Sequence, residues 1–452
     1  MKNSSFRDHS GYMFKHNKEV YRQINKIYQA NYKKLIESGL YEALNGLLIR
    51  HEEIDLDRGF EDACYRIIKP EQIKYITYPF EWCFSQLKDA ALLTLRIQKI
   101  AMKYGMSLKD ASAYNIQFVK GKPIFIDTLS FEMYDETKSW VAYGQFCRHF
   151  LAPLALMSYV DINMNKLFVT NIDGVPLDLC KKLLPFNAKL NIGLLIHIIA
   201  HDNHSKSHEK DEAIDKSKIQ CSRLALEGIL DSLISTIKNL KFPYPNTEWG
   251  NYYNNTNYTD KAEKAKYELV KEYLERVSPS SVGDLGANRG DFSRIASNMD
   301  IETLAFDIDM VAVEKNYTKI KKDFETKILP LVADLTNPAP AIGFANLERD
   351  GFATRYNFDV AMALALIHHI SISNNVPFDN SARFFKNLAE YLIIEFVPKS
   401  DSKVKILLGT REDIFDDYTV EEFEKVYTQH YDIIDKQPVE ASERILYLMR
   451  RK

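Results

Sequence analysis

One stretch of this 452-residue chain decides the fold of its second half: Val282-Gly283-Asp284-Leu285-Gly286-Ala287-Asn288-Arg289-Gly290. Apolar residues and an acid precede two glycines four positions apart, and a helical apolar pattern begins at Phe292. This order predicts a strand, a tight turn and a helix N-terminus. Glycines let the backbone approach a ligand closely, and the free N–H groups of a first helical turn attract polar groups. The stretch therefore predicts a nucleotide-binding turn.

The residues after this turn alternate between strand and helix patterns. Strands are predicted at 281–285, 303–307, 328–332, 358–365 and 391–396, and two more at 431–434 and 444–449. The alternation predicts an α/β fold, with a doubly wound, mostly parallel sheet that binds its ligand at the carboxyl ends of the strands. Asp307 ends the second strand, where it can accept hydrogen bonds from a ribose. Asp334 follows the third strand, where it can bind an adenine amino group.

Two classes of cofactor use such a frame. Dinucleotide enzymes place Gly-x-Gly-x-x-Gly in the first turn, so that a pyrophosphate rests on the helix N-terminus. Here Asp284 ends the first strand, and its charge would repel a pyrophosphate but attract an ammonium group. From Trp249 to the C-terminus the chain resembles class I S-adenosylmethionine-dependent methyltransferases, which have a Rossmann-like sheet and also finish it with an antiparallel pair.

The resemblance implies roles for individual residues around S-adenosylmethionine. The methionine moiety would be surrounded by Asp284, Gly286, Asn288 and Gly290. Asp307 would bind the ribose, with Asp309 as the alternative, and Asp334 with Leu335 would bind the adenine. No metal is implied in this half of the chain.

Candidate catalytic residues follow the fourth and fifth strands. His368 and His369 come after the fourth strand, and Glu395 lies near the end of the fifth. A histidine there could take a proton from an acceptor hydroxyl, because its pKa lies near neutral pH, and Glu395 could orient that histidine or bind substrate. Methyl transfer from a sulfonium can also proceed through positioning and desolvation alone. Structural histidines are therefore the alternative, and the sequence does not distinguish His368 from His369.

The first half, residues 1–240, predicts a mainly helical α+β domain, joined by a linker and lead-in helix at 241–280 to the methyltransferase domain at 281–452. Helices are expected at 23–39 and 84–104 and a strand at 73–78. Four histidines, spaced four, three and four residues apart, would share one helical face. They continue into a polar stretch, so an exposed helix end is favoured over a metal site: His197, His201, His204 and His208.

Three polar residues in this half have an informative spacing. Asp110, Asn115 and Asp127 resemble the catalytic and metal-binding loops of protein kinases and aminoglycoside phosphotransferases, in which an Asp orients the acceptor and an Asn and a second Asp hold magnesium. The resemblance implies a degenerate kinase-like fold, with these residues as metal ligands if Mg-ATP binds. Thr128 and Leu129 depart from the Phe-Gly that follows in many kinases. Turn capping by the three residues is the alternative.

Composition excludes some classes of partner. The formal net charge is −3, so no global basic field is present to hold nucleic acid or an anionic membrane. The chain shows neither a signal peptide pattern nor a membrane-spanning apolar run, and its five cysteines occur singly. These features predict a cytoplasmic protein. The oligomeric state stays open, with a dimer as one option.

The sequence thus predicts a methyltransferase that acts on a small molecule or carbohydrate, with O-methylation favoured. Short motifs, among them Tyr78-Pro-Phe-Glu-Trp82 and Glu395-Phe-Val-Pro-Lys399, resemble bacterial two-domain methyltransferases related to nodulation proteins. That resemblance implies a secreted sugar or small metabolite as substrate, with the first half as a lid, substrate platform or dimer interface. The alternatives are a bifunctional kinase and methyltransferase, or a cofactor-binding interaction protein without catalysis.

Overall fold

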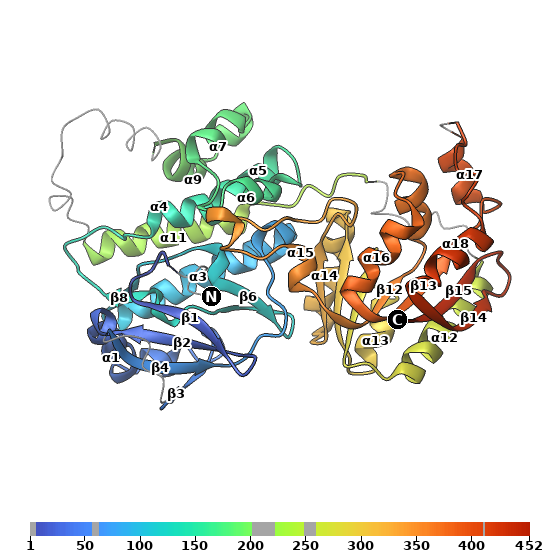
Figure 1. The fold of residues 1–452 in the computed structure, drawn as a ribbon. Helices are drawn as coiled ribbons and strands as arrows, with labels where there is room; N and C mark the ends of the chain where they lie inside the picture. Colours follow the sequence, from blue (N-terminus) through green and yellow to red (C-terminus); the bar gives the residue numbers. More distant parts are fainter. Residues whose placement is uncertain (1–5, 57–62, 201–221, 248–258, 410–411) are drawn as a thin grey trace. The chain divides into compact units, whose positions relative to one another are not determined.

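The computed structural model describes residues 6–56, 63–200, 222–247, 259–409 and 412–452 (Figure 1). The chain forms two compact units. The first comprises Met1–Pro243 with Pro340–Asp350, and the second comprises Tyr244–Ala339 with Gly351–Lys452. Within the described ranges, no helix combines the length and the apolar character that crossing a membrane requires.

The first unit begins with an antiparallel sheet of four strands. Their order in the sheet is β1 (Gly11–His16), β2 (Glu19–Asn25), β4 (Cys64–Pro70) and β3 (His51–Ile54). Asn17 and Lys18 join β1 to β2, and both have the positive φ angles that a tight hairpin turn needs. Because β2 continues to Asn25, the helix predicted from residue 23 is wrong at its start. The helix is α1 (Gln29–Glu37).

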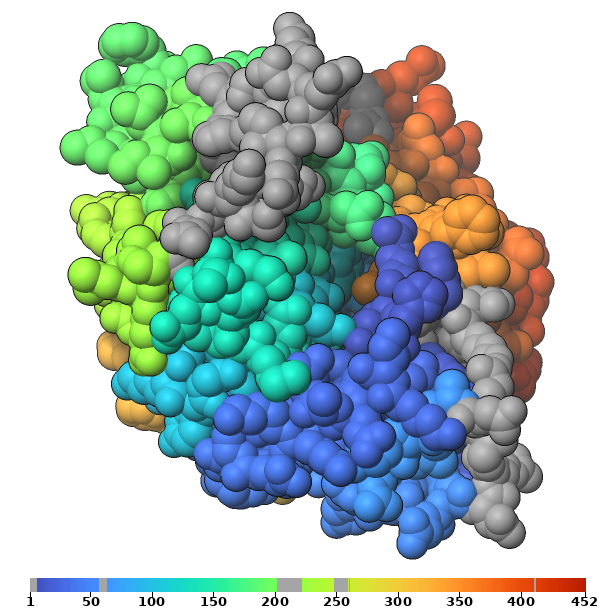
Figure 2. All heavy atoms as spheres, turned by 90° about the vertical axis from the view of Figure 1, so that its left-hand side faces the viewer, coloured from blue at the N-terminus to red at the C-terminus, as the bar shows by residue number. Residues whose placement is uncertain are grey.

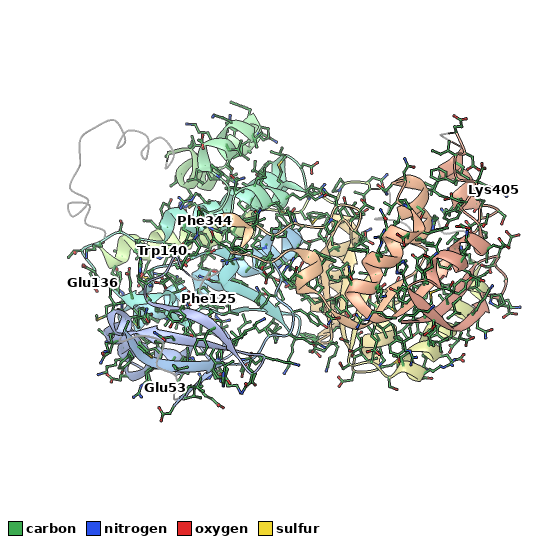
Figure 3. All side chains as sticks on the ribbon, in the orientation of Figure 1. Glu53, Phe125, Glu136, Trp140, Phe344 and Lys405 are labelled. Atoms are coloured by element: carbon green, nitrogen blue, oxygen red, sulfur yellow. The ribbon has the colours of Figure 1, made fainter. Side chains whose placement is uncertain are left out.

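A long helix, α3 (Phe84–Lys103), packs against α11 (Arg223–Asn239) in the same unit. Two short antiparallel pairs follow α3, namely β5 (Met106–Leu108) with β8 (Phe131–Met133) and β6 (Ile116–Val119) with β7 (Lys122–Phe125). Figure 3 labels Trp140, which is buried and whose indole nitrogen donates to the Leu108 carbonyl at 2.8 Å. The other α-helices in the described part of the unit are α2 (Leu40–Ala43), α4 (Tyr143–Phe146), α5 (Ala152–Tyr159), α6 (Leu167–Thr170), α7 (Leu177–Leu183), α8 (Phe186–Lys189) and α9 (Ile192–Leu194).

The strand predicted at 73–78 is wrong. This segment pairs with no strand among the described residues, and side chains hold it instead. The Thr77 backbone N–H donates to Gln117 Oε1 at 2.8 Å, and the Trp82 indole nitrogen donates to Thr77 Oγ1 at 2.9 Å. Apolar alternation alone does not separate such a segment from a strand.

The second unit contains a sheet of seven strands (Figure 1). Their order in the sheet is β11 (Ile328–Val332), β10 (Glu302–Asp307), β9 (Ser281–Leu285), β12 (Phe358–Ala363), β13 (Ala389–Phe396), β15 (Ile445–Arg451) and β14 (Tyr431–Pro438). The first five in this order are mutually parallel, and β15 is antiparallel to both of its neighbours. The predicted doubly wound sheet with a closing antiparallel pair is confirmed.

Helices cover this sheet, and its strand order reverses beside β9, which opens a crevice at the carboxyl ends of β9 and β12. A shared apolar core, including Val270, Val282, Ile295 and Val360, joins the sheet to the helices before and after β9. The α-helices among the residues described for this unit are α12 (Asp260–Val277), α13 (Ser293–Asn298), α14 (Met310–Asp323), α15 (Phe352–Arg355), α16 (Phe378–Leu388), α17 (Ser402–Leu408) and α18 (Val420–Tyr427).

The segment Pro340–Asp350 belongs to the first unit although β11 and α15, before and after it in the chain, belong to the second. Arg7 donates to both oxygens of Glu348 at 2.7 and 2.8 Å, and the Arg349 guanidinium lies 4.9 Å from the centre of the Tyr114 ring. Figure 2 shows this segment in orange beside the blue start of the chain. No motif in the sequence indicates this exchange of a segment between the units.

Candidate functional site

A cavity of about 420 Å³ lies at the carboxyl ends of the strands around β9. Several of the residues for which the sequence predicts cofactor contacts line this one cavity: Asp284, Gly286, Asn288, Asp307, Asp334 and Leu335. Gly290 and Asp309 are not among its lining residues.

The turn after β9 depends on its two glycines. Gly286 and Gly290 have φ angles of 82° and 78°, which side chains rarely tolerate. A Cβ on Gly290 would lie 2.5 Å from the side-chain Nδ2 of Asn316, so only glycine allows this close packing in the turn. Asn288 also has a positive φ, and its backbone N–H donates to Asp307 Oδ2 at 2.7 Å. The turn after β9 is therefore fastened to the end of β10.

Asp284 is 2% exposed at the end of β9, and its Oδ2 accepts a hydrogen bond from Ser293 Oγ at 2.5 Å. Burial raises the pKa of Asp284 to about 7, although the Ser293 bond and the Lys266 charge act in the opposite direction. A buried carboxylate that is costly to ionise gains most from a ligand that carries positive charge.

Asp307 accepts backbone hydrogen bonds on both oxygens, from Asn288 N–H and from Asp309 N–H at 2.8 Å. Burial raises the pKa of Asp307 to about 6, against the effect of these bonds. Asp309 has a different position and role. Its Oδ1 accepts from Val311 N–H at 2.7 Å and so caps the N-terminus of α14.

Asp334 lies in the loop after β11, two residues beyond Val332. Its Oδ1 accepts from the backbone and the hydroxyl of Thr336, at 2.9 and 2.7 Å, and from Asn337 N–H at 3.2 Å. These bonds fix the carboxylate at the cavity wall. Ile308 and Leu335 add apolar surface to the lining of the cavity, as a flat aromatic ligand requires.

The two histidines have different environments. His369 lines the cavity, whereas His368 is 2% exposed and its Nδ1 has no hydrogen-bond partner among the described residues. Burial lowers the pKa of His369 to about 4 and that of His368 well below its usual value. His369 is therefore a neutral imidazole at pH 7 and is the one of the pair that faces the cavity.

Glu395 is fully buried and does not line the cavity. Its Oε2 lies 2.6 Å from Lys266 Nζ and accepts from Ala365 N–H at 2.7 Å, and its Oε1 lies 3.7 Å from the Arg444 guanidinium. Lys266 comes from α12 and lines the cavity, and the sequence reasoning missed it.

Comparison with known proteins identifies the family. The chain is 34% identical over 457 residues to the nodulation protein NoeA of Rhizobium meliloti (strain 1021), and the match covers 99% of this chain and 95% of that protein. This chain belongs to the NoeA family. No protein-family model matches it.

Two of the solved structures that are similar to this NoeA-family chain are methyltransferases. The N-methyltransferase NodS from Bradyrhizobium japonicum WM9 is 11% identical, with a TM-score of 0.33 over 42% of this chain and 97% of NodS. The bifunctional kinase-methyltransferase WbdD is 16% identical, with a TM-score of 0.31 over 42% of this chain and 40% of WbdD. The strand order and directions described above give the second unit its Rossmann-like methyltransferase fold.

In the first unit of this NoeA-family chain, the predicted kinase-like residues come together. Asp110 Oδ1 accepts from Gln145 Nε2 at 2.8 Å, and burial and the Asp127 charge raise the pKa of Asp110. Asn115 Nδ2 donates to Ser130 Oγ at 3.2 Å, and that hydroxyl donates to Asp127 Oδ2 at 2.5 Å.

Asp127 also forms an ion pair with Arg22 of β2, so its charge is already compensated within the protein. No group of three or more acidic, histidine or cysteine side chains suited to a metal occurs in the described part of the chain. His197 is buried and bonds Tyr143 and Ser232, whereas His201, His204 and His208 lie outside the described residues.

Proposed function

We propose that this protein is an S-adenosylmethionine-dependent methyltransferase that methylates an oxygen of a small molecule or carbohydrate. One observation carries the proposal: a single cavity at the strand ends of a methyltransferase fold contains acids suited to all three parts of the cofactor. Asp284 would bind the ammonium of the methionine moiety, Asp307 the ribose, and Asp334 the adenine amino group. The sulfonium of S-adenosylmethionine, when bound, supplies an activated methyl group with a good leaving group.

The remaining work falls to residues around the acceptor. Leu364, Leu366 and Ile370 line the cavity near His369 and would exclude water from the reacting groups. His369 is neutral at pH 7 because burial lowers its pKa to about 4, so its ring can accept a hydrogen bond from an acceptor hydroxyl and orient it, while the low pKa makes it a weak base. Glu395 acts from behind the cavity by fixing Lys266 and the backbone at Ala365.

Methyl transfer can be tested with isotopically labelled S-adenosylmethionine. Oligosaccharides with free hydroxyls, and matched oligosaccharides with free amino groups, would be offered to the full chain, and mass spectrometry would locate the added methyl group. Labelled hydroxyl groups support the proposal. Labelling of amino groups alone would replace O-methylation with N-methylation, and cofactor binding without any product would favour a non-catalytic interaction protein.

Replacing His369 with alanine should lower kcat by roughly tenfold, because one hydrogen bond that orients the acceptor hydroxyl is lost and a base with a pKa of about 4 adds little to the rate. S-adenosylhomocysteine affinity, measured by calorimetry, should change by no more than about threefold, since the proposed cofactor contacts involve other residues. An unchanged kcat would show that positioning and desolvation suffice for the reaction.

Cofactor affinity should depend on pH through Asp284. The ammonium requires an ionised carboxylate, so the affinity for S-adenosylhomocysteine should fall as pH drops through the pKa of about 7. Between pH 8 and pH 6 the expected loss is about 20-fold, of which Asp284 contributes about tenfold and Asp307 about twofold. In Asp284→Asn the loss should shrink to about twofold, because only Asp307, with a pKa of about 6, then titrates in this range. An equal pH dependence in both proteins would contradict the assignment.

Phosphoryl transfer in the first unit is a second candidate, favoured by the convergence of Asp110, Asn115 and Asp127. Opposing it, Arg22 already neutralises Asp127. Thermal unfolding with and without Mg-ATP distinguishes a nucleotide-binding unit from a scaffold that binds no nucleotide. Stabilisation that disappears in Asp127→Asn would support a nucleotide site, and an unchanged melting temperature would leave the unit as a scaffold.

A further inference from the structure

Acidic residues outnumber basic residues in the lining of the cavity. Among the described lining residues, four carry carboxylates and one carries an ammonium group: Glu263, Asp284, Asp307, Asp334 and Lys266. S-adenosylmethionine has the complementary pattern, since its sulfonium and ammonium are positive and its one carboxylate is negative. A buried carboxylate in this cavity would be repelled by the acids and would need the lysine.

Lys266 lines the cavity together with Asp284 and Phe292. Its side chain is 3% exposed, and its Nζ lies 4.7 Å from the centre of the Phe292 ring. Phe292 is the N-cap residue of α13, the helix that follows the glycine turn. The Lys266 charge also acts on Asp284, whose pKa it lowers. Lys266 and Asp284 therefore approach the same region of the cavity from α12 and from β9.

We propose that Lys266 binds the carboxylate of the methionine moiety while Asp284 binds its ammonium group. This inference rests on the proposed function. The paired groups would read both charges of an amino acid, and the cavity would thereby select the complete cofactor over analogues that lack one of the charges.

Glu395 does not prevent this role. Its Oε1 faces Arg444 at 3.7 Å and its Oε2 also accepts the Ala365 N–H, so the carboxylate retains partners when Lys266 shares its ammonium with a ligand. An ammonium group has three N–H donors, enough for Glu395 and for a ligand carboxylate together. The Glu395 ion pair would then orient the Lys266 ammonium toward the cavity.

The test uses three ligands in calorimetry with the full chain: S-adenosylhomocysteine, its decarboxylated analogue, and 5′-methylthioadenosine, which lacks both charged groups. The wild type should bind S-adenosylhomocysteine roughly 30-fold more tightly than the decarboxylated analogue, as expected for one charge-assisted contact. Lys266→Met should remove this preference, while the affinities for the other two ligands stay within about threefold of the wild type.

Two further variants separate ligand binding from structural damage. Lys266→Arg should retain the preference for the carboxylate, and Lys264→Met, an exposed position on the same helix, should leave all three affinities unchanged. If Lys266→Met lowers the affinities for all three ligands by the same factor, Lys266 is a structural residue and the proposal is wrong. If the wild type fails to bind S-adenosylhomocysteine at all, the proposed function itself fails.

Discussion

Replacing Asp307 with alanine should lower the affinity for S-adenosylhomocysteine at least about 100-fold, because two charge-assisted hydrogen bonds to the ribose would be lost. The same substitution removes the acceptor for Asn288 N–H and for Asp309 N–H, so the turn after β9 loses its attachment to β10. Binding and pre-organisation of the turn are therefore lost together. Calorimetry with the purified variant measures the affinity directly.

Asp309→Ala is the matched control for this prediction. Asp309 lies two residues further along the chain, but its carboxylate caps α14 and does not line the cavity. Loss of the cap should cost about 1 kcal/mol of stability and leave the affinity for S-adenosylhomocysteine nearly unchanged. If Asp309→Ala weakened binding more than Asp307→Ala, the ribose contact would belong to Asp309.

Replacing Glu395 with alanine should destabilise the second unit by about 3–5 kcal/mol, because Lys266 would be left as an uncompensated buried charge. Burial already lowers the pKa of Lys266, so the lysine would lose its proton more readily without its partner. Urea unfolding followed by circular dichroism measures the change. The transition of the second unit is the one that S-adenosylhomocysteine shifts to higher urea.

The double variant Glu395→Ala with Lys266→Met controls for this effect. Removing both charges leaves no orphaned ion, so its loss of stability should be smaller than that of Glu395→Ala alone. If Glu395→Ala alone lowers the free energy of unfolding by less than about 1 kcal/mol, Glu395 is not the main partner of Lys266.

The features that the sequence predicts best depend on local pattern. The strand predicted at 281–285 and the strand predicted at 328–332 coincide with β9 and β11, because short apolar runs end sharply at glycine or aspartate. The cavity acids follow from the same pattern. Asp284 and Asp307 end parallel strands, and parallel strands next to the reversal of strand order bring their carboxyl ends together.

Lys266 could not be found in this way, because its burial depends on Glu395, which is 129 residues away in the chain. One sign is present in the sequence. Lys266 lies four residues from Ala262 and four from Val270, both buried, so it interrupts the apolar face of α12. The charge of a lysine usually places it on the solvent side, whereas the spacing places Lys266 on the apolar face, and that conflict is a reason to look for a buried partner.

The errors in the first unit have a similar cause. Ile24, Tyr28 and Tyr32 follow a four-residue spacing and pack in one apolar cluster, yet Ile24 belongs to β2 and Tyr32 to α1. The spacing reflects a shared core across a strand and a helix, so it predicts helix too early. The position of Pro340–Asp350 depends on tertiary contacts such as Arg7 with Glu348, which no local pattern encodes.

The most direct test of the central claim is a calorimetric titration of S-adenosylhomocysteine into the full chain at pH 8, where Asp284 is mostly ionised. The structure described here predicts saturable binding at one site per chain, accompanied by thermal stabilisation, and both effects should be lost in Asp307→Ala. A folded wild-type protein that shows neither binding heat nor stabilisation would contradict the assignment of the cavity to S-adenosylmethionine.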